Sequence, residues 1–305
     1  MKTISQITEA AQDALRTSGK APPRIAAAVA QDEAVLASLA AARTLGLAGG
    51  VLVGDRPAIE EIARKRKIDI SDMEIIHEDN EAAAAITAVG LVRDGRADLV
   101  MKGLVESAVF LRGVLRKDMG LNRGNLVSHV GVIESPNYHK LLLLSDGAIN
   151  IAPGLSEKIS IIENAAGLAR RLGIGRPKIA LLAALEQVNP EKMPCTADAA
   201  ILAQMNRRGR MAGCILDGPL ALDNALSAGS ARIKKIDSPV AGDADILIVP
   251  SIEAGNMLYK SLMYLGKAKS AGLILGTRAP VILTSRADSA ETKQASIALA
   301  VLAWL

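Results

Sequence analysis

Aromatic residues are scarce in this chain of 305 residues, where phenylalanine, tyrosine and tryptophan together make up 2%. Proteins that bind single strands or loops of nucleic acid stack the bases on aromatic rings, and a binding face here would have few rings to offer. The net charge of +4 is also small beside 36 basic and 32 acidic residues. We therefore expect no nucleic-acid partner.

Cysteine is rare as well, with only Cys195 and Cys214. Two cysteines do not make a disulfide framework, and their positions do not match a zinc site. The three histidines, His77, His129 and His139, lack metal-ligand spacing too. The sequence therefore predicts no metal site.

Long apolar runs and targeting segments are missing. No apolar stretch approaches the roughly 20 residues that span a bilayer, and the first residues are polar and helix-like rather than a secretory signal. We expect a soluble, cytoplasmic protein without a membrane partner. Half of the residues are hydrophobic, which is enough for substantial cores, and the length suits two domains.

Strand and helix patterns alternate along most of the chain, which predicts an α/β fold with a mostly parallel sheet and helices on both faces. The pattern changes once, where two strands at 125–133 and 140–145 follow each other across a short loop, so we expect an antiparallel pair there. The other expected strands lie at 24–30, 50–54, 73–77, 98–103, 178–183, 213–217, 245–249 and 281–284, and the expected helices at 32–46, 57–67, 79–94, 106–118, 155–172, 196–208, 220–228, 254–266 and 289–304.

The expected strand at 281–284 ends in polar residues at the start of a helix. Ligands bind at such carboxyl ends in open α/β proteins, and helix N-termini there favour anions. Arg286 offers a planar guanidinium to a phosphate, and Ser285 offers a hydroxyl to an oxyanion or thiolate. The alternative is an ordinary helix start, with Asp288 as N-cap and Glu291 completing a capping box. The two interpretations are compatible.

Three other strand ends carry candidate binding groups. Gly255 and Asn256 open a helix, where backbone N–H groups can approach an anion, although an ordinary turn explains them too. Asp217 precedes Gly-Pro and is either a base or part of a normal strand-to-helix turn. Lys102 ends a strand and can bind an anion, with Arg112 on the next helix; a solvated helix face is the alternative for Arg112.

Five segments, in this order, resemble those of the phosphate acetyltransferase and phosphate butyryltransferase family. GPLALDNALS and VILTSRADS are more similar to the butyryl branch. The segments are ADLVMKG, LLLLSDGAINIAP, ILDGPLALDNALS, PSIEAGNMLYKSLMYLGKAKSAGLILG and PVILTSRADSAETK.

The resemblance implies a fold of two α/β domains with the active site in the cleft between them, like that of the isopropylmalate dehydrogenases. We expect a first domain at 1–130, completed by 276–305, and a second at 131–275. It also implies a homodimer or larger homo-oligomer. No cofactor is expected, since coenzyme A is a substrate.

The activity that the resemblance implies is the interconversion of acyl-CoA plus phosphate with acyl phosphate plus CoA, with a butyryl or broad short-chain acyl group. Ser285 then contacts the oxyanion or thiolate and Arg286 the phosphate. Arg112 matches a second phosphate-binding arginine, and Asn256 lines the cleft.

The chain departs from the acetyl enzymes at the proposed base, because Thr292 stands where a carboxylate is expected. Asp288 and Glu291 are the neighbouring candidates, and local positive charge is another source of thiolate. Three alternatives stay open: a strict phosphate acetyltransferase, a non-catalytic relative that binds CoA or acyl phosphate, and a nicotinamide-dependent dehydrogenase of the same fold. The last is disfavoured by the missing aspartate cluster and adenine-recognition signature.

Overall fold

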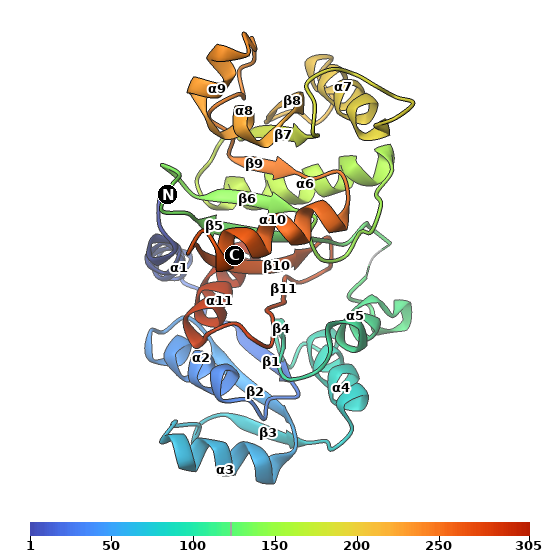
Figure 1. Ribbon diagram of the computed structural model, residues 1–305. Coiled ribbons are helices and arrows are strands. Elements are labelled where there is room, and N and C mark those ends of the chain that lie inside the picture. The colour runs from blue at the N-terminus through green and yellow to red at the C-terminus, as the bar shows by residue number, and fades with distance from the viewer. Residues whose placement is uncertain (123) are drawn as a thin grey trace. The chain divides into compact units, whose positions relative to one another are not determined.

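The computed structural model describes residues 1–122 and 124–305 (Figure 1). The chain divides into two compact units. The terminal unit comprises Ile4–Asn125 and Ala271–Leu305, and the central unit comprises Met1–Thr3 and Leu126–Ser270. The domain limits predicted from the sequence lie a few residues from these boundaries and stay a prediction.

The terminal unit contains a mostly parallel sheet. Its described strands run in the order β3 (Glu74–His77), β2 (Gly49–Gly54), β1 (Arg24–Ala28), β4 (Leu99–Lys102), β11 (Val281–Ile282) and β10 (Lys269–Leu275). The first two residues of β10 are assigned to the central unit. All neighbouring pairs are parallel except β10 with β11. The chain runs outward from β1 to β2 and β3 and then returns to β4 on the other side of β1. The strand order therefore reverses between β1 and β4.

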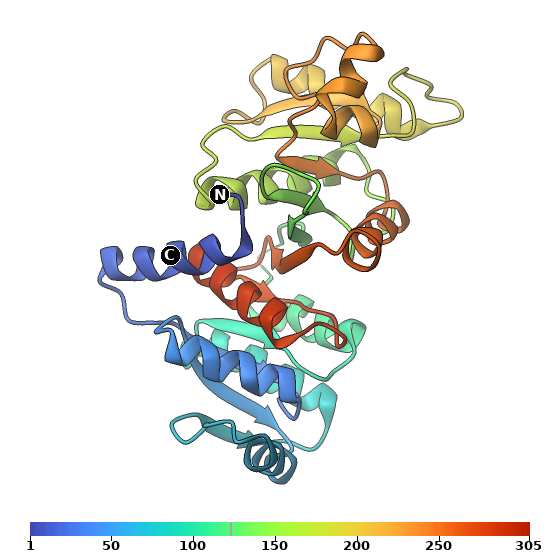
Figure 2. The ribbon, with the colours of Figure 1, turned by 60° about the vertical axis from the view of Figure 1, so that its left-hand side comes forward.

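Helices cover both faces of this sheet, so its strands read as nearly continuous apolar runs. On one face α11 (Ala290–Trp304) packs against α1 (Ile4–Ser18) and α2 (Glu33–Thr44), with α3 (Arg56–Arg66) beside α2 (Figure 2). On the other face lie α4 (Glu81–Arg93) and α5 (Ser107–Leu115). Right-handed crossovers require this split, because the return from β3 to β4 runs opposite to the outward steps. The predicted α/β class is confirmed.

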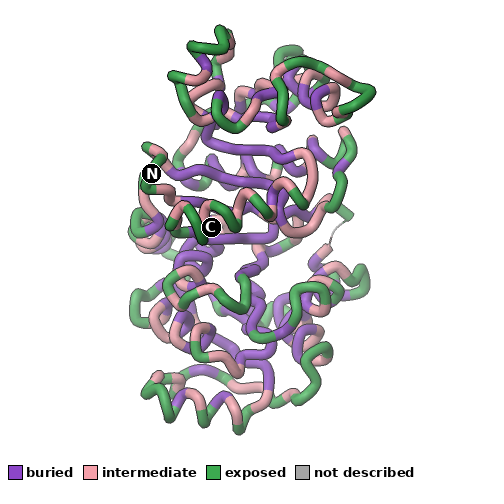
Figure 3. The backbone as a smooth tube through the Cα atoms, viewed as in Figure 1, coloured by how far each residue is buried: buried purple, intermediate pink, exposed green. Residues whose placement is uncertain are grey.

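The central unit holds the predicted antiparallel pair. Its described strands run in the order β5 (Ser128–Glu134), β6 (Leu142–Ser145), β9 (Ile246–Ile248), β7 (Lys178–Leu182) and β8 (Ile215–Leu220). β5 and β6 are antiparallel, as predicted, and the other pairs are parallel. The helices are α6 (Leu155–Arg171), α7 (Pro194–Arg207), α8 (Leu222–Leu226), α9 (Ala228–Ile233) and α10 (Ile252–Tyr264). Figure 3 shows most of the length of these strands as buried.

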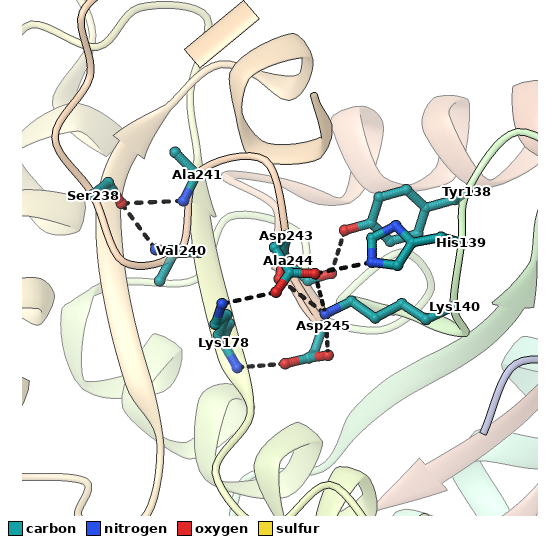
Figure 4. A network of polar contacts seen from close by, with 10 residues as sticks. All are labelled: Tyr138, His139, Lys140, Lys178, Ser238, Val240, Ala241, Asp243, Ala244 and Asp245. Atoms are coloured by element: carbon teal, nitrogen blue, oxygen red, sulfur yellow. Dashed lines mark hydrogen bonds and ion pairs between the residues drawn. The ribbon is translucent and has the colours of Figure 1, made fainter. Parts of the chain in front are cut away.

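Charged side chains anchor the start of β9, which is only three residues long. Lys140 and Lys178 both bind the Asp243 carboxylate, at 2.8 and 2.7 Å, and Lys140 also reaches Asp245 at 2.6 Å (Figure 4). Burial raises the pKa of Asp243, but the hydrogen bonds from the two lysines outweigh it and hold that pKa below its usual range. This network ties β9 to the segments that begin β6 and β7.

Three details of the fold differ from the sequence prediction. The strand β10 was not expected, because its small and apolar residues lack a strong β pattern. β8 continues through Pro219 to Leu220. Proline has no N–H to donate, and an edge strand tolerates it because one side of the strand has no partner. The helix expected at 220–228 is instead the two short helices α8 and α9. No helix in the described parts of the chain has the length and apolarity to cross a membrane.

Candidate active site

Three strands of the terminal unit end side by side at the reversal in strand order. Ala28 of β1 pairs with Lys102 of β4, and Met101 of β4 pairs with Ile282 of β11. All three strands are parallel, so their carboxyl ends lie at one edge of the sheet. In open α/β sheets ligands bind outside the carboxyl ends at such a reversal. The geometry marks this edge as the candidate site of the terminal unit.

Lys102 lies at the centre of this edge and is buried, with 1% of its surface exposed. Its Nζ donates to the carbonyl oxygens of Gly103 and Val105, both at 3.1 Å. Burial, together with the positive charges of Lys293 and Arg286, lowers the pKa of Lys102 to about 8, and the charges of Asp288 and Asp32 oppose this shift. The predicted anion-binding lysine is therefore one of several cations gathered at one point.

The backbone at the ends of β1 and β4 is tightly packed. A Cβ on Gly103 would lie 2.2 Å from the carbonyl oxygen of Val29, so only glycine fits. Val29 is fully buried and has a φ of 56°, a left-handed conformation that a β-branched residue adopts only under strain. Strain of this kind concentrates at functional sites, where the surrounding structure holds it in place.

The Ser285–Asp288 loop connects β11 to α11 and carries the predicted catalytic residues. The Asp288 carboxylate accepts the N–H of Ser285 at 2.7 Å, and the Ser285 hydroxyl accepts the N–H of Ala287 at 3.3 Å. The side chains of Ser285 and Arg286 are exposed. The loop thus presents a hydroxyl and a guanidinium to solvent, above the buried lysines.

The predicted capping of α11 was wrong in one respect. Ser289, not Asp288, is the N-cap, because its hydroxyl accepts the N–H of Thr292 at 3.2 Å. Asp288 instead closes the loop that precedes the helix. Glu291 is exposed in the first turn, where a hydrogen bond from the Ser289 side chain lowers the pKa of its carboxyl.

Two further groups at this site were missed from the sequence. Lys293 is buried and donates to the loop, and the buried hydroxyl of Thr284 has no hydrogen-bond partner among the described residues. Lys293 had a detectable signal, because it stands on the same helix face as Ser296, Ile297 and Ala300, all of which are buried. A lysine within an apolar helix face indicates a functional group or a buried partner.

Arg112 is exposed on α5, and its Nε donates to the carbonyl oxygen of Ala108 at 3.3 Å. The neighbouring Arg116 is paired with Asp118 at 2.5 Å. Within residues 1–122 and 124–305, Arg112 forms no ion pair. Its guanidinium is thus available to an anion, and its phosphate-binding role stays a prediction.

The other candidates lie in the central unit. A Cβ on Gly255 would lie 2.8 Å from the carbonyl oxygen of Asp146, and the Asn256 amide donates to the carbonyl oxygen of Gly147 at 3.1 Å. The Gly255 N–H already bonds to the carbonyl oxygen of Ser251 at 3.1 Å. These contacts pack α10 against the loop after β6. Binding of substrate by Gly255 and Asn256 stays a prediction.

Asp217 lies within β8 rather than at its end, because the strand continues to Leu220. Its carboxylate is 3.5 Å from Nη2 of Arg207 and is 14% exposed. β7 separates β8 from β9, the strand that leads to Gly255 and Asn256. The structure therefore does not bring Asp217 together with those two residues.

The chain is similar to several known proteins. The family model described as phosphate acetyl/butaryl transferase matches residues 57–301. The phosphate butyryltransferase of Clostridium acetobutylicum is 50% identical over 288 residues, which cover 94% of this chain and 95% of that protein. The phosphate acetyltransferase of Rhizobium meliloti is 44% identical over 271 residues, which cover 89% and 85%.

A solved structure is also similar. The branched-chain phosphotransacylase from Enterococcus faecalis has a TM-score of 0.79 and 36% identity, covering 92% of this chain and 99% of that one. The detailed likeness to isopropylmalate dehydrogenases stays a prediction. Sequence and structure together show that the chain belongs to the phosphate acetyltransferase and butyryltransferase family.

Proposed function

We propose that this acyltransferase interconverts a short-chain acyl-CoA plus phosphate with acyl phosphate plus CoA, with a butyryl or broad short-chain preference. The observation that carries the proposal is the exposed Ser285–Arg286 pair. It lies at the reversal in strand order, next to the buried cations Lys102 and Lys293. Among the described residues, these cations form no ion pair with a carboxylate. A bound phosphate dianion would neutralise their charge. Relatives named phosphate butyryltransferase support the four-carbon preference.

The reaction requires a thiolate, a hydrogen-bond donor to the oxyanion and cations that bind the phosphate. The thiolate sulfur attacks the carbonyl carbon of the acyl phosphate and forms a C–S bond. The carbonyl oxygen becomes an oxyanion, which then collapses as the C–O bond to phosphate breaks. The Ser285 hydroxyl donates to the developing charge, and Arg286 holds the leaving phosphate. Arg112 supplies the second cation in this proposal.

The thiol proton leaves to a base at the same loop. Asp288 is our first candidate because its carboxylate is fixed against the Ser285 N–H and so lies beside the reacting groups. Glu291 is the second, one helical turn away and exposed. The nearby positive charge also favours the thiolate form of CoA, so a weakly basic carboxylate is sufficient to accept the thiol proton.

A homo-oligomer is part of the proposal. Met257 and Tyr264 project from one face of α10 and Leu265 follows the helix as its C-cap. Tyr264 and Leu265 are 75% and 83% exposed. Their spacing of seven and eight residues places them on one stripe of the helix. We assign this stripe to contact with a second copy of the chain. We also place the enzyme in the cytoplasm, where the free thiols Cys195 and Cys214 remain reduced.

The test is phosphate-dependent release of free CoA thiol from acetyl-, propionyl-, butyryl- and isobutyryl-CoA, with arsenate and no-phosphate controls. The fastest release with four-carbon substrates supports the butyryl assignment, and the fastest release with acetyl-CoA moves it to the acetyltransferases. Absence of release from folded protein contradicts the proposal and favours a non-catalytic relative.

Two variants test the residue roles. Ser285→Ala and Arg286→Ala should each lower kcat by about 100-fold or more, because each removes a group that meets developing charge. Arg66→Ala is the matched control, since Arg66 is an exposed arginine of the same unit that pairs with Glu33 on the protein surface. Unchanged rates in both site variants would contradict the assignment.

A further inference from the structure

Lys293 joins the two ends of the catalytic loop. Its Nζ lies 3.2 Å from the carbonyl oxygen of Ser285 and 2.7 Å from that of Asp288. One ammonium group thus binds the first and last residues of the Ser285–Asp288 loop. The side chain is 2% exposed, so the ammonium faces the loop from within the protein.

A lysine at this position is energetically unfavourable as a packing residue. Burial lowers the pKa of Lys293, with Asp32 and Asp288 opposing the shift. No described carboxylate forms an ion pair with it, and the surrounding face of α11 consists of small and aliphatic side chains. A methionine would fill the same space without the desolvation penalty. The contribution that offsets this penalty is the pair of hydrogen bonds to the loop.

The loop has few other constraints. Its internal hydrogen bonds join Ser285 to Asp288 and Ala287, and the side chains of Ser285, Arg286 and Ala287 are exposed. These bonds define the local turn but do not attach it to the body of the unit. Lys293, the fourth residue of α11, provides that attachment.

The neighbouring strand end uses the same device. Lys102 donates to the carbonyl oxygens of Gly103 and Val105, which begin the segment after β4. Two buried lysines therefore each bind two carbonyl oxygens, on adjacent strand ends of one sheet. The repetition points to a shared role in shaping the edge where Ser285 and Arg286 act.

We infer that Lys293 is a positioning residue, whose buried ammonium holds the Ser285–Asp288 loop so that the Ser285 hydroxyl and the Arg286 guanidinium meet the substrate together. Lys293 itself does not touch substrate, because its donors face the backbone of the loop. The inference rests on the proposed function for its catalytic consequence. Its structural part, the fixing of the loop, stands independently.

The test compares Lys293→Met with the wild type in two measurements. Hydrogen exchange of the Ser285 amide, which is bonded to Asp288, should become at least about 10-fold faster, because the loop loses its attachment. In acyl transfer, kcat/KM should fall by about 100-fold, because displacement of reacting groups by about 1 Å has effects of that size. The far-ultraviolet circular dichroism should not change.

Lys293→Arg and Lys158→Met are the matched variants. Arginine keeps several donors for the two carbonyl oxygens, so Lys293→Arg should retain rates within about 10-fold of the wild type. Lys158 is also buried but pairs with Asp198 in the central unit at 2.6 Å. Lys158→Met measures the general effect of losing a buried lysine and should leave exchange in the Ser285–Asp288 loop unchanged.

Two results would overturn the inference. One is Lys293→Met with wild-type exchange at Ser285 and kcat/KM within about threefold. The other is equal acceleration of that exchange in Lys158→Met, which would show a global rather than a local effect. If Lys293→Met does not fold, the exchange of Lys293→Gln, which keeps one donor group, decides between these outcomes. A wild type without acyl transfer would contradict the proposed function, whereas the exchange data would still judge the fixing of the loop.

Discussion

Replacement of Lys102 by methionine should change the stability of the terminal unit in a pH-dependent way. Relative to the wild type, the variant should be more stable near neutral pH than at alkaline pH. The folded-state pKa of Lys102 is about 8, below the ordinary value of 10.5. The unfolded chain therefore binds the proton more tightly than the folded chain does. In the wild type the charged lysine opposes folding below about pH 8, and this effect disappears as the pH rises toward 10.5.

The magnitude follows from the difference between the two pKa values. A difference from 10.5 to about 8 corresponds to about 3 kcal/mol, which is fully present well below pH 8. Between about pH 7 and about pH 9.5 the wild type should regain about 2 kcal/mol of unfolding free energy at this residue. Lys102→Met has no such group. The stability of the variant relative to the wild type should thus fall by about 2 kcal/mol across this range.

The loss of hydrogen bonds to Gly103 and Val105 adds a nearly constant destabilisation of about 1–3 kcal/mol, so the pH dependence is the diagnostic quantity. Urea unfolding followed by the fluorescence of Trp304 reports on the terminal unit, in which Lys20 lies 4.8 Å from the indole ring. Lys158→Met, which removes a buried lysine of the central unit that pairs with Asp198, is the control for the loss of a buried lysine as such. A stability difference between Lys102→Met and wild type that is constant within about 0.5 kcal/mol, or that grows with pH, would refute the reasoning.

Three further predictions concern other parts of the chain. Gly103→Ala should lower the unfolding free energy by about 2–4 kcal/mol, because the new Cβ would lie 2.2 Å from the carbonyl oxygen of Val29. Urea unfolding measures this loss, and a loss below about 0.5 kcal/mol would contradict the close contact. Asp146→Asn should cost about 1–3 kcal/mol in the same assay, since the carboxylate accepts several backbone N–H groups and an amide replaces one acceptor with a donor; full stability would contradict this role. Leu265→Glu should reduce the proposed homo-oligomer to monomers in light scattering, whereas Ile233→Glu, at an equally exposed position on α9, should not. An unchanged mass for Leu265→Glu would contradict the assignment of this stripe to the interface.

The element types were largely predictable because strand and helix periodicities are local properties. The antiparallel β5–β6 pair was predicted from the short loop between two apolar strands. β10 was missed because its pairing with β11 depends on residues brought together only by tertiary structure. The extension of β8 through Pro219 was missed for a related reason, since only its place at the sheet edge makes the proline acceptable.

The candidate site was only partly predictable. Ser285, Arg286 and Lys102 were selected because polar residues at strand ends are a local signal, and the structure places Arg286 near Lys102. The role of Asp288 as a loop acceptor, rather than an N-cap, depends on the backbone path of the loop. Lys293 was missed because its effect requires knowing that α11 is buried on the face that carries it.

The division of the chain also has a consequence for biosynthesis. Apart from Met1–Thr3, the central unit lies between Asn125 and Ala271 of the terminal unit, so all its residues leave the ribosome before β11 and α11 do. We expect the central unit to fold first. Until then the strands β1 to β4 lack β11, which pairs with β4 in the complete sheet. The edge of β4 then stays open to mispairing until β11 is made. The Ser285–Asp288 loop is synthesised after the whole of the central unit, and nascent chains that stop before Ala271 lack it.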